Sequence, residues 1–219
     1  MVDLFSMKKN LFNKIHSTND RSIRTALRGI LYNDLEKYRS ESGHPAEIFE
    51  EFGVQHGTAR IDVAVINGIM HGYEIKSDCD TLERLPEQMN EFNAVFDRLT
   101  LVVGKRHLHK AMYIVPDWWG IILAKVDSRN QVVLHTIRES ETNKKQVRIS
   151  IARLLWREEA LQILVERNKA KGVRSKPREF IYERLVNVLD EVDLKKKVSD
   201  LLTSRQAWKS SLSLTTGGD

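Results

Sequence analysis

The stretch ARIDVAVINGIMHGYEIK, residues 59–76, contains two β-strand patterns joined by a turn signal. Its first eight residues are apolar on both faces of a strand except at Asp62, which is typical of a central strand covered on each side. Asn67 and Gly68 form a strong hairpin signal, and the residues that follow make a third strand. The stretch therefore predicts a hairpin that carries one acidic residue on its first strand.

The second strand of this hairpin carries Glu74 and Lys76, which are two residues apart and project from the same face. A two-residue turn would place Glu74 on the opposite face from Asp62. A three-residue loop through Ile69, or a bulge near Gly72, would bring the two carboxylates together. We therefore expect one of these two irregularities if Asp62, Glu74 and Lys76 form a common site.

The patterns on either side of the hairpin predict the order helix, three strands, helix, strand, helix and a pair of strands. Asn19 or Asp20 is the expected N-cap of the first helix, and Asp80 with Glu83 has the spacing of a capping box for the second. This order predicts a mixed α/β fold. The strands are expected at 47–54, 59–66, 69–76, 98–104, 118–126 and 131–137, and the helices at 18–38, 80–96 and 105–115.

The domain organisation follows from where these patterns stop. Residues 19–149 form the expected α/β domain, and residues 150–209 are helical and basic. We expect a flexible N-terminal arm over 1–18 and a disordered tail over 210–219, because both lack a long amphipathic pattern.

Composition limits the class of protein. The chain has 219 residues, 41% of them hydrophobic, and no apolar stretch reaches the roughly 20 residues that span a bilayer. With a single cysteine, Cys79, an internal disulfide is excluded, and the expected location is the cytoplasm. The net charge of +5 permits nucleic-acid binding without requiring it.

The three polar residues of the hairpin suggest a chemistry. Two carboxylates such as Asp62 and Glu74 are hard oxygen ligands that suit Mg²⁺, and Lys76 could hold a water or a phosphate oxygen. Metal-assisted hydrolysis of a phosphodiester needs this combination. Alternatively, Asp62 is satisfied by a backbone amide or by Arg60, and Glu74 with Lys76 is a surface ion pair of about 0–1 kcal/mol.

The run IDVAVINGIMHGYEIK resembles the D-x(n)-E-x-K core of the PD-(D/E)XK nuclease superfamily. The segments ARIDVAVING, HGYEIKSDCDTLERLPEQ and VPDWWGI resemble a family of small bacterial proteins assigned to that superfamily. The resemblance implies a restriction-endonuclease-like core of helix, three-stranded meander, helix and strand, followed here by an all-helical C-terminal extension.

The resemblance also implies roles for individual residues. Asp62 and Glu74 would bind Mg²⁺, with Mn²⁺ as a second candidate, and Lys76 would be the catalytic lysine. Glu51 is the expected additional acid, and Glu47 and Glu50 are alternatives to it.

The helix after the lysine strand extends the resemblance, with two departures from the family pattern. Gln88 and Phe92 match a glutamine and an aromatic residue, four apart, in RecB-type nucleases, although Phe92 stands where a tyrosine is usual. Ile61 stands where the family pattern has a proline.

A basic loop is expected between two of the C-terminal helices, in RNKAKGVRSKPR, residues 167–178. It contains six basic residues and no acidic one, and Gly172 and Pro177 are placed to end one helix and start the next. Such a loop could follow a phosphate backbone, or it could be a solvated linker. The residues expected to contact nucleic acid are Lys169, Lys171, Arg174, Lys176 and Arg178.

Two functions from different classes follow from these features. The first is a metal-dependent nuclease that hydrolyses DNA, with RNA a less favoured substrate. The alternative is a nucleic-acid-binding or regulatory module that has a nuclease-like fold and does not cut. A third interpretation treats the helical region as an element for forming a homodimer.

Overall fold

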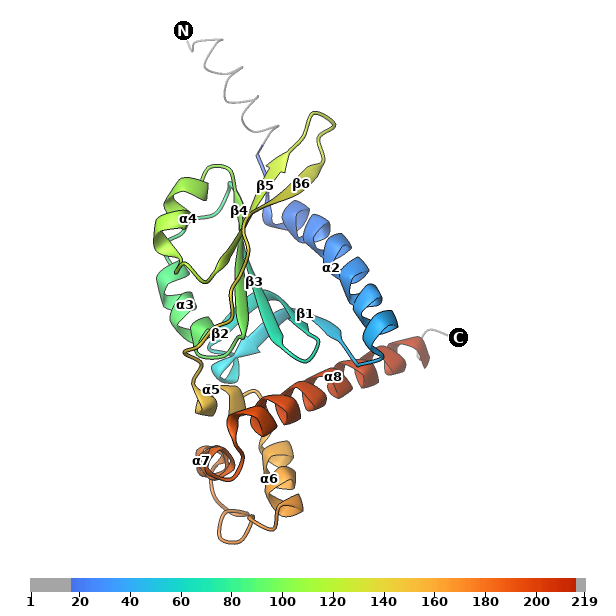
Figure 1. The fold of residues 1–219 in the computed structure, drawn as a ribbon, viewed down its shortest axis with the longest axis vertical. Helices are drawn as coiled ribbons and strands as arrows, with labels where there is room; N and C mark the ends of the chain where they lie inside the picture. Colours follow the sequence, from blue (N-terminus) through green and yellow to red (C-terminus); the bar gives the residue numbers. More distant parts are fainter. Residues whose placement is uncertain (1–16, 216–219) are drawn as a thin grey trace.

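The computed structural model describes residues 17–215, with side chains described as far as Arg205. One mixed sheet of six strands lies at its centre, in the order β1-β2-β3-β4-β5-β6 (Figure 1). Neighbouring strands are antiparallel except for the parallel pairs β3–β4 and β4–β5. The strands are β1 (Glu47–Val54), β2 (Ala59–Ile66), β3 (Met70–Lys76), β4 (Arg98–Gly104), β5 (Gly120–Val126) and β6 (Val132–Arg138).

Helices cover both faces of this sheet, so the mixed α/β class predicted from the sequence is confirmed (Figure 1). The order of strands and helices through the α/β domain is also as predicted. The helices are α2 (Asp20–Ser42), α3 (Leu85–Asn93), α4 (Leu108–Ile114), α5 (Arg148–Ala152), α6 (Arg157–Glu166), α7 (Arg178–Val188) and α8 (Glu191–Thr215), with a short 3-10 turn η1 (Gln55–Gly57).

The two ends of the chain fall largely outside this description. Residues 1–16 of the expected flexible arm and 216–219 of the expected disordered tail lie outside the described residues. Helix α8 continues to Thr215, so the helix extends into the segment that the sequence predicts to be disordered.

Helix α2 covers one face of the sheet because its apolar residues recur every four positions. Ile23, Leu27, Leu31 and Leu35 are all buried there, against residues from β1, β2, β3, β4 and β5. The N-cap is Asn19, whose Oδ1 accepts a hydrogen bond of 2.9 Å from the backbone N–H of Ser22. This confirms one of the two predicted caps.

Helix α3 starts later than predicted. Asp80 does not cap it: its Oδ2 accepts hydrogen bonds from the backbone N–H and the hydroxyl of Ser77, over 2.8 Å and 2.6 Å, and so closes a turn directly after β3. The helix begins at Leu85, with Arg84 as its N-cap. The capping-box prediction at Asp80 is therefore wrong, because the short acidic side chain bonds back to its own turn instead.

The β2–β3 hairpin has the three-residue loop that a common site requires. Ile66 pairs with Met70, and this register continues to the pair Val63–Tyr73. Gly72 pairs regularly with Ala64, so the alternative of a bulge at Gly72 is wrong. Asp62 and Glu74 are the next residues along the two strands beyond the last regular pair.

The C-terminal helices form the second half of one continuous core. Residues of α5, α6, α7 and α8 are buried together with residues of β1, β2 and α3. Helix α8 runs across the base of the sheet and contacts β1 and β2 (Figure 1). Across residues 17–215, we find no helix with both the length and the apolar character needed to cross a membrane.

Candidate functional site

An acidic groove of about 670 Å³ lies at the ends of β1, β2 and β3, beside α3. Every residue that the sequence proposes for the catalytic site lines it, namely Glu51, Asp62, Glu74, Lys76 and Gln88. Among the described residues, seven acidic side chains and three basic ones line this groove. The acidic ones are Asp20, Glu51, Asp62, Glu74, Asp80, Glu87 and Glu91, and the basic ones are Arg60, Lys76 and Arg84.

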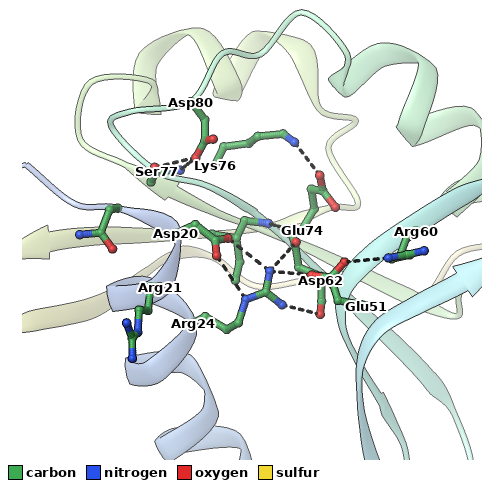
Figure 2. Close-up of polar contacts among 12 residues, drawn as sticks. Asp20, Arg21, Arg24, Glu51, Arg60, Asp62, Glu74, Lys76, Ser77 and Asp80 are labelled. Atoms are coloured by element: carbon green, nitrogen blue, oxygen red, sulfur yellow. Dashed lines mark hydrogen bonds and ion pairs between the residues drawn. The ribbon is translucent and has the colours of Figure 1, made fainter.

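A guanidinium group lies among the carboxylates of this groove (Figure 2). Arg24 reaches in from α2, and its Nη2 lies 2.8 Å from Asp62 Oδ1 and 3.0 Å from Glu51 Oε1. The same nitrogen lies 3.3 Å from an oxygen of Asp20, one helical turn earlier. Arg24 therefore forms ion pairs with three carboxylates at once.

Asp62 has partners for both of its carboxylate oxygens. Oδ2 accepts a hydrogen bond of 2.7 Å from the backbone N–H of Ile75, and Oδ1 accepts one from Arg24. Burial raises the pKa of Asp62, and the bonds from Ile75 and Arg24 oppose that rise. Burial acts to lower the pKa of Arg24, but its bonds to Asp20 and Asp62 outweigh burial and raise it.

Glu74, Lys76 and Gln88 form a buried group next to this cluster. Lys76 Nζ lies 2.6 Å from Glu74 Oε1 and 3.1 Å from Gln88 Oε1. The Glu74 side chain is only 2% exposed, and burial together with the nearby charge of Asp62 raises its pKa to about 7, although Lys76 opposes the rise. Among the described residues, its second oxygen, Oε2, has no hydrogen-bond partner.

The sequence left three candidates for the additional acid, and the structure separates them by position. Glu51 lies in the groove, and its backbone has a φ of 50°, a left-handed conformation that non-glycine residues seldom adopt. Glu47 and Glu50 lie away from it, paired with Arg39 and Arg28 over 2.9 Å in each case. Glu51 thus has the position expected of the additional acid, while its role stays a prediction.

The carboxylates that the resemblance assigns to a divalent metal ion have partners within the protein. Both oxygens of Asp62 and one oxygen of Glu74 accept hydrogen bonds from protein cations or from a backbone N–H, while Glu74 Oε2 has no partner among the described residues. Within the part of the chain that the structure describes, no group of three or more His, Cys, Asp or Glu side chains is placed to hold a metal ion. Mg²⁺ or Mn²⁺ at Asp62 and Glu74 stays a prediction.

Sequence reasoning missed Arg24 and offered Arg60 as the partner of Asp62. Arg60 instead lies 3.7 Å from Glu51, at a more exposed position (Figure 2). The backbone amide that the sequence analysis offered as the other possible partner of Asp62 does bond to it. The sequence signal for Arg24 was weak: it lies four residues after Asp20 on the polar side of a helix, like many solvated arginines.

The basic loop at residues 167–178 is held on the protein surface by two apolar anchors. Ala170 and Val173 are 4% and 6% exposed and belong to the core. Arg157 Nη2 supports the loop from α6 by donating to the backbone carbonyls of Arg174 and Lys176, over 2.5 Å and 3.2 Å. The loop therefore has a defined conformation that does not depend on its charged side chains.

The charged side chains of this basic loop point away from the core. The five residues expected to contact nucleic acid are all exposed: Lys169, Lys171, Arg174, Lys176 and Arg178. Within the described residues, none of these five has a carboxylate at ion-pair distance, whereas Arg167, at the start of the loop, pairs with Asp193 over 2.8 Å. The loop thus offers five positive charges to solvent.

Comparison with known proteins identifies relatives of the chain. The sequence model of the family described as "Bacteriophage P4 protein cII" matches residues 17–216. Protein cII of Enterobacteria phage P4 is 40% identical over 77 residues, which are 35% of this chain and 29% of the phage protein. The aligned region is therefore less than a third of that relative's length. No solved structure matches the chain.

These findings overturn the nuclease prediction. The matched family and the relative are both described as phage P4 protein cII, and neither description names a nuclease or other hydrolase. The prediction of a DNA-cleaving nuclease, drawn from the D-E-K pattern, is therefore wrong. The findings agree better with the alternative of a module that does not cut. No comparison bears on the PD-(D/E)XK resemblance, which stays a prediction.

Proposed function

The chain belongs to the family of the bacteriophage P4 protein cII, and from this premise we propose that it is a regulatory protein that binds nucleic acid, with DNA as the expected partner, and does not cut it. The observation that carries the proposal is the basic loop at residues 167–178, where five exposed basic side chains have no acidic partner among the described residues.

The construction of the basic loop supports contact with phosphates. A solvated linker needs no buried anchors, yet Ala170 and Val173 attach this one to the core and Arg157 bonds to its backbone. The positive charges are therefore held in place before any ligand arrives, which lowers the entropy lost on binding. Lysine and arginine contacts to phosphates add affinity that falls with salt and reads no base sequence.

The acidic groove supports the absence of cutting. A phosphate backbone would be repelled by its excess of carboxylates unless cations compensated them. In this protein the compensating charges are Arg24 and Lys76, which are parts of the chain. We infer that nucleic acid lies on the basic loop and not in this groove.

The α/β domain also has the element order of a particular fold. Helix α2, the β1–β2–β3 meander, α3 and β4 follow one another in the order of a restriction-endonuclease-like core. We infer that the chain uses such a core as a scaffold, with an arginine among the carboxylates and a helical basic region added after β6.

The test is binding of a labelled 30-base-pair DNA by fluorescence anisotropy at several salt concentrations. We compare the wild type with the double variant Lys171→Gln/Arg174→Gln, which leaves the backbone contacts of the basic loop in place. Each lost phosphate contact reduces the slope of log affinity against log salt by about one, so we expect a reduction of about two. Binding at moderate salt should weaken roughly 10-fold.

The matched control is Lys125→Gln/Arg129→Gln, which removes the same charge from exposed positions in the β5–β6 hairpin, at the opposite end of the molecule (Figure 1). Its salt slope and affinity should equal those of the wild type within about twofold. Equal effects of the two double variants would show that net charge, not the basic loop, governs binding. Absence of binding by the wild type to this duplex and to a single strand of the same sequence would refute the proposed function.

A further inference from the structure

A second groove, of about 450 Å³, lies where the sheet meets the helical region, and its charge is opposite to that of the acidic groove. It opens between the end of β1, the start of α6, the start of α7 and α8. Five basic residues and one acidic residue of the described chain line it. The basic ones are His56, Arg153, Arg157, Arg178 and Arg205, and the acidic one is Glu158.

Two of these arginines are tied to carboxylates, a third is only weakly paired and also supports the basic loop, and the fourth has no carboxylate partner among the described residues. Arg153 pairs with Glu179 over 2.9 Å, and Arg205 pairs with Glu159. Arg157 lies 3.5 Å from the exposed carboxylate of Glu158, a weak pair. Among the described residues, Arg178 has no carboxylate at ion-pair distance.

An exposed indole ring lies in the same groove. Trp156 is 57% exposed although tryptophan is among the most costly side chains to leave in water. The guanidinium of Arg205 lies 4.3 Å from the centre of its ring. Arg205 is fixed by Glu159, and so it supports the ring in one orientation.

The groove continues into the basic loop. Arg157 bonds to the backbone of the loop at Arg174 and Lys176, and Arg178 is both the last residue of the loop and the first residue of α7. A second exposed aromatic ring, Phe180, is 54% exposed next to Lys176, whose Nζ lies 5.9 Å from the ring centre. Phe180 does not line the groove, because it lies two residues from both Arg178 and Tyr182 on α7. The exposed ring of the groove is therefore that of Trp156, which lies among the cations of its lining.

We propose that this groove binds single-stranded nucleic acid, with one base stacked on Trp156 and the adjacent phosphate between Arg157 and Arg178. Aromatic rings interleaved with basic side chains suit unpaired bases, because every base has a face to stack, whereas a duplex keeps its bases covered. A purely electrostatic surface would need no exposed tryptophan. The inference rests on the proposed function and names the form of nucleic acid that it involves.

The experiment compares a labelled 20-nucleotide single strand with the duplex of the same sequence, in one buffer, by anisotropy. We expect Trp156→Leu to weaken binding of the single strand roughly 10-fold and to change binding of the duplex less than twofold. Trp156→Phe, which keeps an aromatic face, should restore most of the loss. Tyr113→Leu, at an 80% exposed aromatic position on α4, is the matched control and should change neither affinity.

Circular dichroism and the thermal midpoint of each variant check that the fold is intact. Equal effects of Trp156→Leu on both forms, or no effect on either, would overturn the single-strand assignment while leaving nucleic-acid binding in place. Loss on leucine that phenylalanine does not restore would also overturn it. If the wild type binds neither form, the proposed function fails together with this inference.

Discussion

The guanidinium of Arg24 bonds to Asp62 at two places, the side-chain carboxylate and the backbone carbonyl. Nη2 donates to the carboxylate oxygen Oδ1 over 2.8 Å, and Nη1 donates to the backbone carbonyl over 2.9 Å. The double contact joins α2 to β2 where the strand leaves its regular pairing with β3. A cation supplied by the chain therefore compensates the carboxylates of the acidic groove.

Replacing Arg24 should destabilise the protein. Loss of one member of a fully buried ion pair costs about 3–5 kcal/mol, because the remaining charge stays without a partner. The side chains of Arg24 and Asp62 are 16% and 20% exposed, so we expect the free energy of unfolding to fall by about 2 kcal/mol in Arg24→Met. Urea unfolding at neutral pH measures it.

Arg28 provides the matched control on the same helix. It pairs with Glu50 over 2.9 Å, but the two side chains are 45% and 37% exposed. Arg28→Met should therefore cost less than about 1 kcal/mol. Equal losses in the two variants would contradict the role assigned to Arg24.

The buried Glu74 should make stability depend on pH. Its pKa in the folded protein is about 7, against an ordinary value of 4.5, so between these values the folded state binds its proton more tightly than the unfolded state. Stability should then fall as pH rises from 4.5 to 7, unlike the usual case of an acid whose pKa is lowered.

The variant Glu74→Gln isolates this effect, since it keeps the shape of the side chain and cannot ionise. Relative to the wild type, it should gain roughly 2–3 kcal/mol between pH 4.5 and pH 8, as followed by urea unfolding. The exposed Glu87→Gln, from the same groove, is the control. A difference between wild type and Glu74→Gln that stays constant with pH would show that burial does not raise this pKa.

Much of the fold could be predicted because its signals are local. The four-residue repeat of Ile23, Leu27, Leu31 and Leu35 corresponds to one buried helix face. The apolar run of residues 59–66 forms β2, an interior strand with a neighbour on each side. The prediction that Asp80 caps a helix was wrong, because aspartate both caps helices and closes turns. Only the geometry of the folded chain decides between these two roles.

The sequence predicted which residues lie together in the groove, but the function predicted from them was wrong. The spacing of Asp62, Glu74 and Lys76 brought them into one groove. Their chemistry depends on Arg24, which lies 38 residues before Asp62 in sequence, and no local pattern links the two. A motif of acids and a lysine therefore could not separate a metal site from a cluster that carries its own cation.

A side chain at Gly72 should be destabilising, although Gly72 does not form the bulge expected of it. A Cβ at this position would lie 2.4 Å from Ile61 Cδ1 and 2.8 Å from Leu99 Cδ2. These atoms end flexible side chains and can shift, so we expect Gly72→Ala to lower the free energy of unfolding by about 1–3 kcal/mol.

Gly29 provides the opposite case, because nothing lies within 4 Å of its Cβ position and it lies inside α2. Gly29→Ala should therefore raise stability by up to about 1 kcal/mol, through helix propensity. Thermal and urea unfolding midpoints should fall for Gly72→Ala and rise for Gly29→Ala. A stabilised Gly72→Ala would contradict the close packing of β3 against β2 and β4.

The protein is expected to bind nucleic acid and to leave it intact. The most direct measurement incubates purified protein with labelled single- and double-stranded DNA, in Mg²⁺, Mn²⁺ or EDTA, and divides each sample between a native and a denaturing gel. We predict retarded DNA on the native gel and full-length DNA on the denaturing gel in all three conditions. Metal-dependent shortening of the DNA that Asp62→Ala and Lys76→Ala both abolish would show that the protein is a nuclease after all.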